Sequence, residues 1–186
     1  MEKIRCSWCE KDDLYRNYHD EEWGVPMYDD QKIFEYLVLE SFQAGLSWYT
    51  ILKKREKFRA AFDDFNYKKI AQYNEEKIAQ LMQDAGIVRN RLKILATVNN
   101  SQRFLEVQQE FGTFSKYIWS FVDGKPIVNH PKTLKDVPAP SEISDSLAKD
   151  LKKRGFKFLG STVMYAHMQA TGMVNDHVAD CHCRKK

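Results

Sequence analysis

The sequence predicts an all-α fold built as a single domain over residues 1–186. Apolar residues recur at the three- and four-residue spacing of helices along almost the whole chain. No stretch alternates apolar and polar residues for more than a few positions, as strands would require. The chain has no linker or internal repeat, and 186 residues are enough for one sizeable core.

Two capped helices are predicted between residues 29 and 62. Asp29 or Asp30 can accept hydrogen bonds from the first amides of one helix, and Ser47 can do so for the next. Gly45 separates the two helices. Their core-facing positions are Ile33, Phe34, Leu37, Val38, Ile51, Leu52, Phe58 and Phe62.

Further helices are predicted along the rest of the chain. Asn74 precedes two glutamates, which form an acidic first turn, and this helix is expected to end at Gly86. The stretch from Asp123 to Pro140 holds four of the 5 prolines and is expected to be a long loop. The other helices are expected to end near Gly112, Phe121, Gly155 and Gly172.

Charge and hydropathy exclude some classes of protein. Lys plus Arg is 29 and Asp plus Glu is 26, so the net charge of +3 permits a nucleic-acid partner without requiring one. No apolar run reaches the roughly 18 residues of a membrane span. The first residues hold no apolar stretch that could act as a signal peptide. We therefore expect a cytoplasmic protein with no membrane partner.

Cysteines and histidines cluster at both ends of the chain. In a reducing compartment such clusters indicate a metal site rather than disulfides, and zinc takes four such ligands in closed structural sites. Cys6 and His19 can combine with His177 and Cys181, which lie four residues apart. The rival sets are the four cysteines alone or a mixture that includes His182. The candidate ligands are thus Cys6, Cys9, His19, His177, Cys181, His182 and Cys183.

One carboxylate falls on the apolar face of a predicted helix. On a helical wheel Glu40 lies about 20° from Ile33, between Tyr36 and Leu37. Burying an unpaired carboxylate is costly. Glu40 is therefore either paired with an arginine or with backbone amides, or it forms the floor of a binding pocket.

A leucine and several aromatic residues have two possible roles. Leu46 follows Gly45 at a tight turn, where it either packs on the neighbouring helix or acts as a wedge between DNA bases. The aromatic residues belong either to the core or to stacking faces of a pocket. They are Trp8, Tyr15, Tyr18, Trp23 and Trp48.

The connection at Gly86 has the form of a helix-hairpin-helix motif. Free amides at the start of the second helix, with Arg89, Arg91 and Lys93, would make a phosphate site. The alternative is an ordinary glycine cap between packed helices. Other basic residues are typical of solvated helix faces. They are Lys53, Lys54, Arg55, Lys152, Lys153, Arg154 and Lys157.

Several segments together resemble the DNA-3-methyladenine glycosylase I family. They occur in the family's order, extend over nearly the whole chain, and include long and unusual motifs. They are Tyr18–Gly24, Glu40–Trp48, Thr50–Glu56, Leu151–Phe158 and Val174–His177.

The resemblance implies a helix-hairpin-helix glycosylase fold with one structural zinc ion. The zinc would join the two ends of the chain, about residues 1–24 and 164–186. Among the sets left open above, the resemblance selects as ligands Cys6, His19, His177 and Cys181.

The resemblance also implies roles in a base pocket and at the DNA. It makes Glu40 the catalytic residue and gives substrate contacts to Tyr18 and Trp48, with Trp8 and Tyr15 nearby. On physical grounds we expect Glu40 to be ionised, because a carboxylate complements a cationic base. The hairpin at Gly86, with Arg89 and Arg91, would hold DNA phosphates, and Leu46 beside Gly45 would fill the gap left by a flipped nucleotide. Phe42 departs from the polar residue expected in the family.

The implied activity is hydrolysis of the N-glycosidic bond of 3-methyladenine, and of 3-methylguanine, in double-stranded alkylated DNA. The expected enzyme is a bacterial monomer that flips the base out, releases free 3-methyladenine and has no lyase activity. No aspartate follows Gly86 before Asp123, which agrees with an enzyme that relies on the lesion's own instability. The alternative is a zinc-stabilised DNA-binding module without catalysis, which would not explain Glu40.

Overall fold

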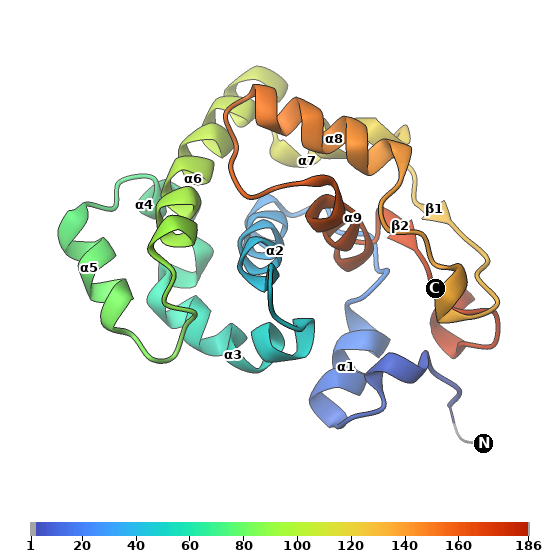
Figure 1. Cartoon of the computed structure of the whole chain (residues 1–186). Coiled ribbons are helices and arrows are strands. Elements are labelled where there is room, and N and C mark those ends of the chain that lie inside the picture. Colours follow the sequence, from blue (N-terminus) through green and yellow to red (C-terminus); the bar gives the residue numbers. More distant parts are fainter. Residues whose placement is uncertain (1–2, 186) are drawn as a thin grey trace.

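The computed structural model describes residues 3–185 and is mostly helical, as the sequence predicts (Figure 1). Short 3₁₀ turns η1 (Ser7–Cys9), η2 (Asp63–Phe65), η3 (Ser120–Val122), η4 (Leu134–Asp136) and η5 (His182–Lys185) connect the longer elements. Two very short strands, β1 (Ile127–Val128) and β2 (Val174–Asn175), pair in parallel. The α-helices are α1 (Asp13–Glu21), α2 (Asp30–Gln43), α3 (Trp48–Ala61), α4 (Tyr67–Ile70), α5 (Glu75–Gln83), α6 (Arg91–Phe111), α7 (Phe114–Trp119), α8 (Glu142–Lys153) and α9 (Ser161–Ala170).

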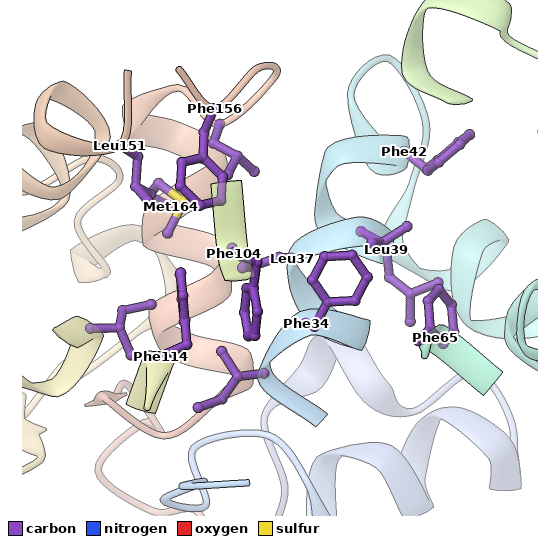
Figure 2. Packing of buried hydrophobic residues seen from close by; sticks show 14 of the residues in the cluster. Phe34, Leu37, Leu39, Phe42, Phe65, Phe104, Phe114, Leu151, Phe156 and Met164 are labelled. Atoms are coloured by element: carbon purple, nitrogen blue, oxygen red, sulfur yellow. The ribbon is translucent and has the colours of Figure 1, made fainter. Parts of the chain in front are cut away.

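Helix α2 is the central element of the molecule. Helices α3 to α6 lie on one side of it and α7 to α9 on the other (Figure 1). Every residue from Ile33 to Phe42 is buried, so over that length α2 has no solvent-facing side. Figure 2 shows Phe34 of α2 facing Phe104 of α6, with Phe65 on the opposite flank of the helix. Any charged residue of this segment is therefore removed from water.

The caps predicted at Asp29 and Ser47 are confirmed, and Asn74 and Thr113 cap two further helices. Asp29, Ser47, Asn74 and Thr113 each precede a helix, and each side chain accepts a hydrogen bond from an amide of the first turn. Helix α6 ends at Gly112, which has a φ of 85° that suits glycine. Helix ends in this protein thus follow from local hydrogen bonding.

The structure differs from the expected elements in three ways. Helices α1 and α4 were not expected, and neither were the two strands, because such short elements carry too little periodicity to be recognised. Helix α5 ends at Gln83 rather than at Gly86. The chain turns early because Asp84 accepts a hydrogen bond from the Gly86 amide at 2.7 Å.

The two ends of the described chain lie close together (Figure 1). The His182 amide donates to the Ile4 carbonyl at 2.9 Å, and Arg5 forms an ion pair with Asp20 at 2.9 Å. Strand β2 pairs Val174 with Ile127 of the long loop, which fixes the segment just before His177. Among the described residues, no helix has both the length and the apolar character needed to cross a membrane.

Candidate functional site

Histidines and cysteines from the two chain ends meet in one buried group. His19, His177, Cys181 and Cys183 place their ligand atoms within 4.8 Å of one another. His19 Nε2 lies 3.4 Å from Cys181 Sγ, a separation compatible with two ligands of one tetrahedral zinc ion. Three of the four expected ligands are therefore brought together, and the fourth member of the group is Cys183.

The outer nitrogens of both histidines in this group are held by oxygen atoms. His19 Nδ1 lies 2.8 Å from an Asp20 carboxylate oxygen, and His177 Nδ1 lies 2.8 Å from the Asn175 side-chain oxygen. Such contacts fix the tautomer that presents Nε2 as a lone-pair donor, as is usual for metal-binding histidines. The donor set and its supporting contacts thus fit a zinc ion.

Cys6 lies beside this group rather than within it. Its thiol hydrogen-bonds to Cys181, which raises the pKa of Cys6 and lowers the pKa of Cys181, with further help from His19. The Cys183 amide also donates to Cys181 Sγ at 3.4 Å. Cys9 points elsewhere, because its thiol donates to the Cys6 carbonyl at 3.1 Å. Cys181 is therefore the thiolate of the pair.

A cavity of about 250 Å³ opens where α1, α2, α3 and α9 meet. All five residues expected in the base pocket line it, namely Glu40 and four aromatic side chains. The complete lining is Trp8, Tyr15, Tyr18, Trp23, Glu40, Gln43, Trp48, Leu134, Val137, Ala166 and Gln169.

Two tryptophans that line the cavity pack against the histidines of the histidine and cysteine group. Trp8 contacts His19 with ring centroids 5.3 Å apart, and Trp23 contacts His177 at 4.6 Å. Tyr18 contacts Trp48, with ring centroids 5.4 Å apart. Displacing the histidines would therefore disturb the pocket.

Glu40 is buried in the floor of the cavity without a charge partner. Its side chain is 3% exposed, and Oε2 has no hydrogen-bond partner among the described residues. Burial raises the pKa of Glu40 to about 8. Burial thus favours the protonated acid in the free pocket at pH 7, and the ionised carboxylate beside a cationic base stays a prediction.

Trp48 adds a second polar group with no partner. Its indole Nε1 is buried and makes no hydrogen bond to any described residue. Buried polar groups are normally satisfied, so such a group in a cavity is a candidate for ligand contact. The pocket thus presents one acidic and one donor group among apolar rings.

The turn between α2 and α3 has the form that the sequence predicts. Gly45 adopts a φ of 85°, and the Leu46 side chain is 41% exposed at the tip. A groove of about 170 Å³ runs along this turn and the first turns of α9. Glu40, Gln43 and Ala166 line both this groove and the cavity of about 250 Å³, so the two hollows adjoin.

In the connection between α5 and α6, fewer groups are free to bind a phosphate than the sequence predicts. Asn90 already accepts a hydrogen bond from the Lys93 amide, and Arg91 pairs with Glu75 at 2.6 Å. Arg89 is exposed and forms no ion pair with a described residue. The placement of Lys93 at a phosphate site is wrong, because its side chain is buried and bonds to carbonyls of the α2–α3 turn.

Phe42 does not face the expected gap in the DNA. Its side chain is fully buried and packs against Phe58 at 5.0 Å and Phe62 at 6.0 Å. The apolar residue at this position therefore belongs to the core.

A second helix connection beside the tip is also basic. Lys152 is exposed in the last turn of α8, and Lys157 and Phe158 are exposed in the segment that joins α8 to α9. Neither lysine forms an ion pair with a described residue. Gly160 precedes α9 and offers no side-chain cap. The first turn of α9 lines the Leu46 groove, so this connection flanks the tip.

Comparison with known proteins decides the family. The family described as methyladenine glycosylase matches residues 8–185. The chain belongs to this family. It is 50% identical to the DNA-3-methyladenine glycosylase 1 of Escherichia coli (strain K12), over 96% of each chain.

Solved structures of methyladenine glycosylases have the same fold. A crystal structure of a 3-methyladenine DNA glycosylase I matches with a TM-score of 0.94 and 49% identity, covering 97% of this chain and 99% of the other. A structure from Staphylococcus aureus, described as the basis of 3-methyladenine recognition by that enzyme, matches with a TM-score of 0.94 at 42% identity, covering 98% and 97%. The family resemblance of the sequence motifs is thus confirmed.

Some pocket residues of this methyladenine glycosylase were not expected from the sequence. Trp23 is one of the aromatic residues for which the sequence leaves open a core position or a stacking face, and it lines the cavity. Ala166 and Gln169 lie three residues apart on one face of α9, which is a usable signal only once that face is known to meet the pocket. The others missed were Gln43, Leu134 and Val137.

Proposed function

We propose that this protein excises 3-methyladenine from alkylated double-stranded DNA by hydrolysing the N-glycosidic bond. The observation that carries this proposal is the unpaired, buried Glu40 at the floor of an aromatic cavity. The relatives named for the same activity support it. 3-Methylguanine carries the same positive charge and is the second candidate substrate.

The methylated base carries a positive charge, and the Glu40 carboxylate can recognise this charge by electrostatic attraction. Methylation at N3 makes adenine a cation and a good leaving group, so no strong acid or covalent nucleophile is needed. Entry of a cation beside Glu40 favours the ionised carboxylate and lowers the pKa from about 8. The ionised form then stabilises the charge that develops at the sugar during cleavage. A neutral adenine gains nothing from this interaction.

The aromatic residues hold the flipped base. Trp48 and Tyr18 can stack on its cationic ring, a contact of up to roughly 2 kcal/mol when water is excluded. The Trp48 indole N–H is available to a base acceptor, because it bonds to no described residue. Trp8 and Tyr15 close the same wall.

Base flipping uses the turn between α2 and α3. Leu46, beside Gly45, fills the space that the extruded nucleotide leaves, and the groove leading to Glu40 receives the nucleotide. Arg89 and Arg91 after Gly86 contact phosphates on one side of the tip in the manner of a helix-hairpin-helix motif. Lys152 and Lys157, which are exposed and form no ion pair with described residues, supply the corresponding contacts on the other side.

One structural zinc ion ties the chain ends of this single domain. Cys6, His19, His177 and Cys181 hold it, and its chemistry is to fix their positions rather than to act on DNA. The family resemblance selects Cys6 rather than Cys183 as the fourth ligand, and the Cys6 thiol bonds to Cys181.

The protein acts as a monomer in the bacterial cytoplasm, where the chromosome lies. It has no lyase activity, since the described pocket lining contains no lysine that could attack the sugar. The products are an abasic site in an intact strand and free 3-methyladenine.

Release of free base tests the proposed activity. Duplex DNA carrying 3-methyladenine is incubated with the protein, the soluble products are separated by chromatography, and the DNA is examined for alkali-labile sites. We expect free 3-methyladenine and intact strands that break only in alkali. Tight binding without base release would instead identify a non-catalytic DNA-binding module.

A further inference from the structure

A buried lysine connects helix α6 to the turn that carries Leu46. Lys93 lies in the first turn of α6, is 6% exposed, and donates from Nζ to the Phe42 carbonyl at 3.0 Å and to the Ala44 carbonyl at 2.8 Å. Both carbonyls belong to the end of α2. The side chain therefore crosses from one predicted DNA-contact element to the other.

The C-terminus of α2 needs such a donor. The last carbonyls of a helix have no partner within it, and a cation there is stabilising. Helix α2 has no basic residue in its last turn, and its own chain satisfies only part of the end, through the Leu46 amide and the Gln43 carbonyl at 2.6 Å. Lys93 supplies the missing cation from α6, and it fixes the backbone that leads into Gly45.

A second lysine makes the reverse connection. Lys54 lies on α3, the helix that starts just after the tip, and its Nζ donates to the Ala85 carbonyl at 3.3 Å and the Gly86 carbonyl at 3.2 Å. Gly86 also lies close to α3, because a Cβ added to it would be 3.1 Å from Lys57 Cβ. Each of the two turns is thus held by a lysine from an element next to the other.

Neither lysine forms an ion pair with a described carboxylate. Their ammonium groups are therefore available to hydrogen-bond to the backbone carbonyls of the two turns. We propose that Lys93 and Lys54 are positioning residues that hold the Leu46 turn and the Gly86 turn in one fixed relation. A wedge and a phosphate contact can engage the same duplex only if their spacing is constant. This proposal rests on the proposed wedge role of Leu46, and it assigns to the two lysines the positioning of the turn that carries Leu46.

The test compares single-turnover base release from duplex DNA with release from an unpaired methylated adenine. Lys93→Met keeps the length of the side chain and removes its donors. We expect a loss on duplex of at least about fivefold, the effect of one hydrogen bond, with little loss on the unpaired base. Lys93→Arg should restore part of the duplex activity. Lys68→Met, which removes an exposed charge on α4, is the matched control and should change neither rate.

A double-mutant cycle separates positioning from simple destabilisation. If Lys93 acts through Leu46, adding Lys93→Met to Leu46→Ala should cost little more than Leu46→Ala alone. Losses that multiply, or that are equal on both substrates, would overturn the proposal. Lys54→Met, at a less buried site, gives the same cycle with Arg89→Ala if Lys93→Met does not fold.

Hydrogen exchange distinguishes failure of this proposal from failure of the wedge role. Lys93→Met should speed amide exchange at residues 44–47, and Lys54→Met should do so at residues 85–87. If Leu46→Ala shows no duplex-specific loss while these amides exchange faster, the wedge role fails and the connection stands. Unchanged exchange in both variants would overturn the connection itself.

Discussion

Glu35 and Glu40 lie on the same buried helix, yet only one of them has charge partners. Glu35 is bound by Arg59 at 2.7 Å and Lys32 at 3.2 Å. Glu40 has neither a cation nor a hydrogen-bond donor for Oε2 among the described residues. Retaining an uncompensated carboxyl in a core costs stability, so its presence at a cavity floor is best explained by a cationic ligand.

The pH dependence of stability gives a prediction for Glu40. Its pKa in the folded state, about 8, is above the ordinary value, so the stabilisation is complete in acid and is lost as pH rises through about 8. Glu40→Gln removes this loss. We expect the variant to melt at a higher temperature than wild type at pH 9, with a smaller difference at pH 5.5. Each unit of pKa shift corresponds to about 1.4 kcal/mol.

Thermal unfolding of both proteins at the two pH values is the measurement. Other groups titrate equally in the two proteins, so only the difference between them counts. A variant that is less stable than wild type at pH 9 would mean that the ionised carboxylate supports the fold.

At the scale of elements, two helix connections are the proposed contacts to the DNA phosphates. The α5–α6 turn offers Arg89 and Arg91, although Arg91 already pairs with Glu75. The α8–α9 connection offers Lys152 and Lys157. Each lost phosphate contact should reduce the slope of log affinity against log salt by about 1.

Alanine substitutions in each connection test these contacts. Arg89→Ala and Lys157→Ala should weaken binding to damaged and undamaged duplexes to the same extent and flatten the salt dependence. Binding titrations at several salt concentrations measure both effects, with Lys68→Ala as the control. An unchanged slope for Arg89→Ala would remove the α5–α6 turn from the DNA surface.

The sequence predicts elements well where local hydrogen bonds define them. Ser47 and Asn74 are recognisable caps because the side chain and its amide partner are neighbours in the chain. The β1–β2 pair was missed because Val174 meets Ile127 only after the chain has folded. Lys93 was misassigned for the same reason, since its carbonyl partners lie about fifty residues away in sequence.

The residues that line the pocket can likewise be predicted from the sequence only where the signal is local. Glu40 was identified because a carboxylate on an apolar helix face is visible in the residue spacing alone. Ala166 and Gln169 carry no such signal, since nothing in α9 itself indicates which face meets the cavity. The local sequence pattern thus identified the buried carboxyl group of the cavity, and the tertiary structure was needed to identify the residues around it.

At the scale of the whole molecule, the proposed zinc ion supports both the chain ends and the pocket. Trp8 and Trp23 line the cavity and also contact His19 and His177. Purified protein should contain about one zinc per chain. Cys6→Ala and Cys181→Ala should lose the metal, lower the melting temperature and weaken base binding.

Matched substitutions serve as controls for the ligand set. Cys9→Ala and Cys183→Ala should keep the zinc, since the first thiol bonds to the Cys6 carbonyl and the second cysteine supports Cys181 through its amide. Metal content and thermal unfolding of all four variants are compared. Loss of zinc from Cys183→Ala but not from Cys6→Ala would replace Cys6 by Cys183 as the fourth ligand.

The central claim is that Glu40 recognises the positive charge of the methylated base. The most direct test is the pH dependence of kcat/KM for release of 3-methyladenine by wild type and Glu40→Gln. For wild type we predict a value that rises with pH and levels off above about 8, as Glu40 of the free enzyme ionises. For Glu40→Gln we predict no such rise and a rate at least about tenfold lower at the plateau, or about 1.4 kcal/mol of transition-state stabilisation. Equal rates, or the same pH profile in both proteins, would contradict the claim.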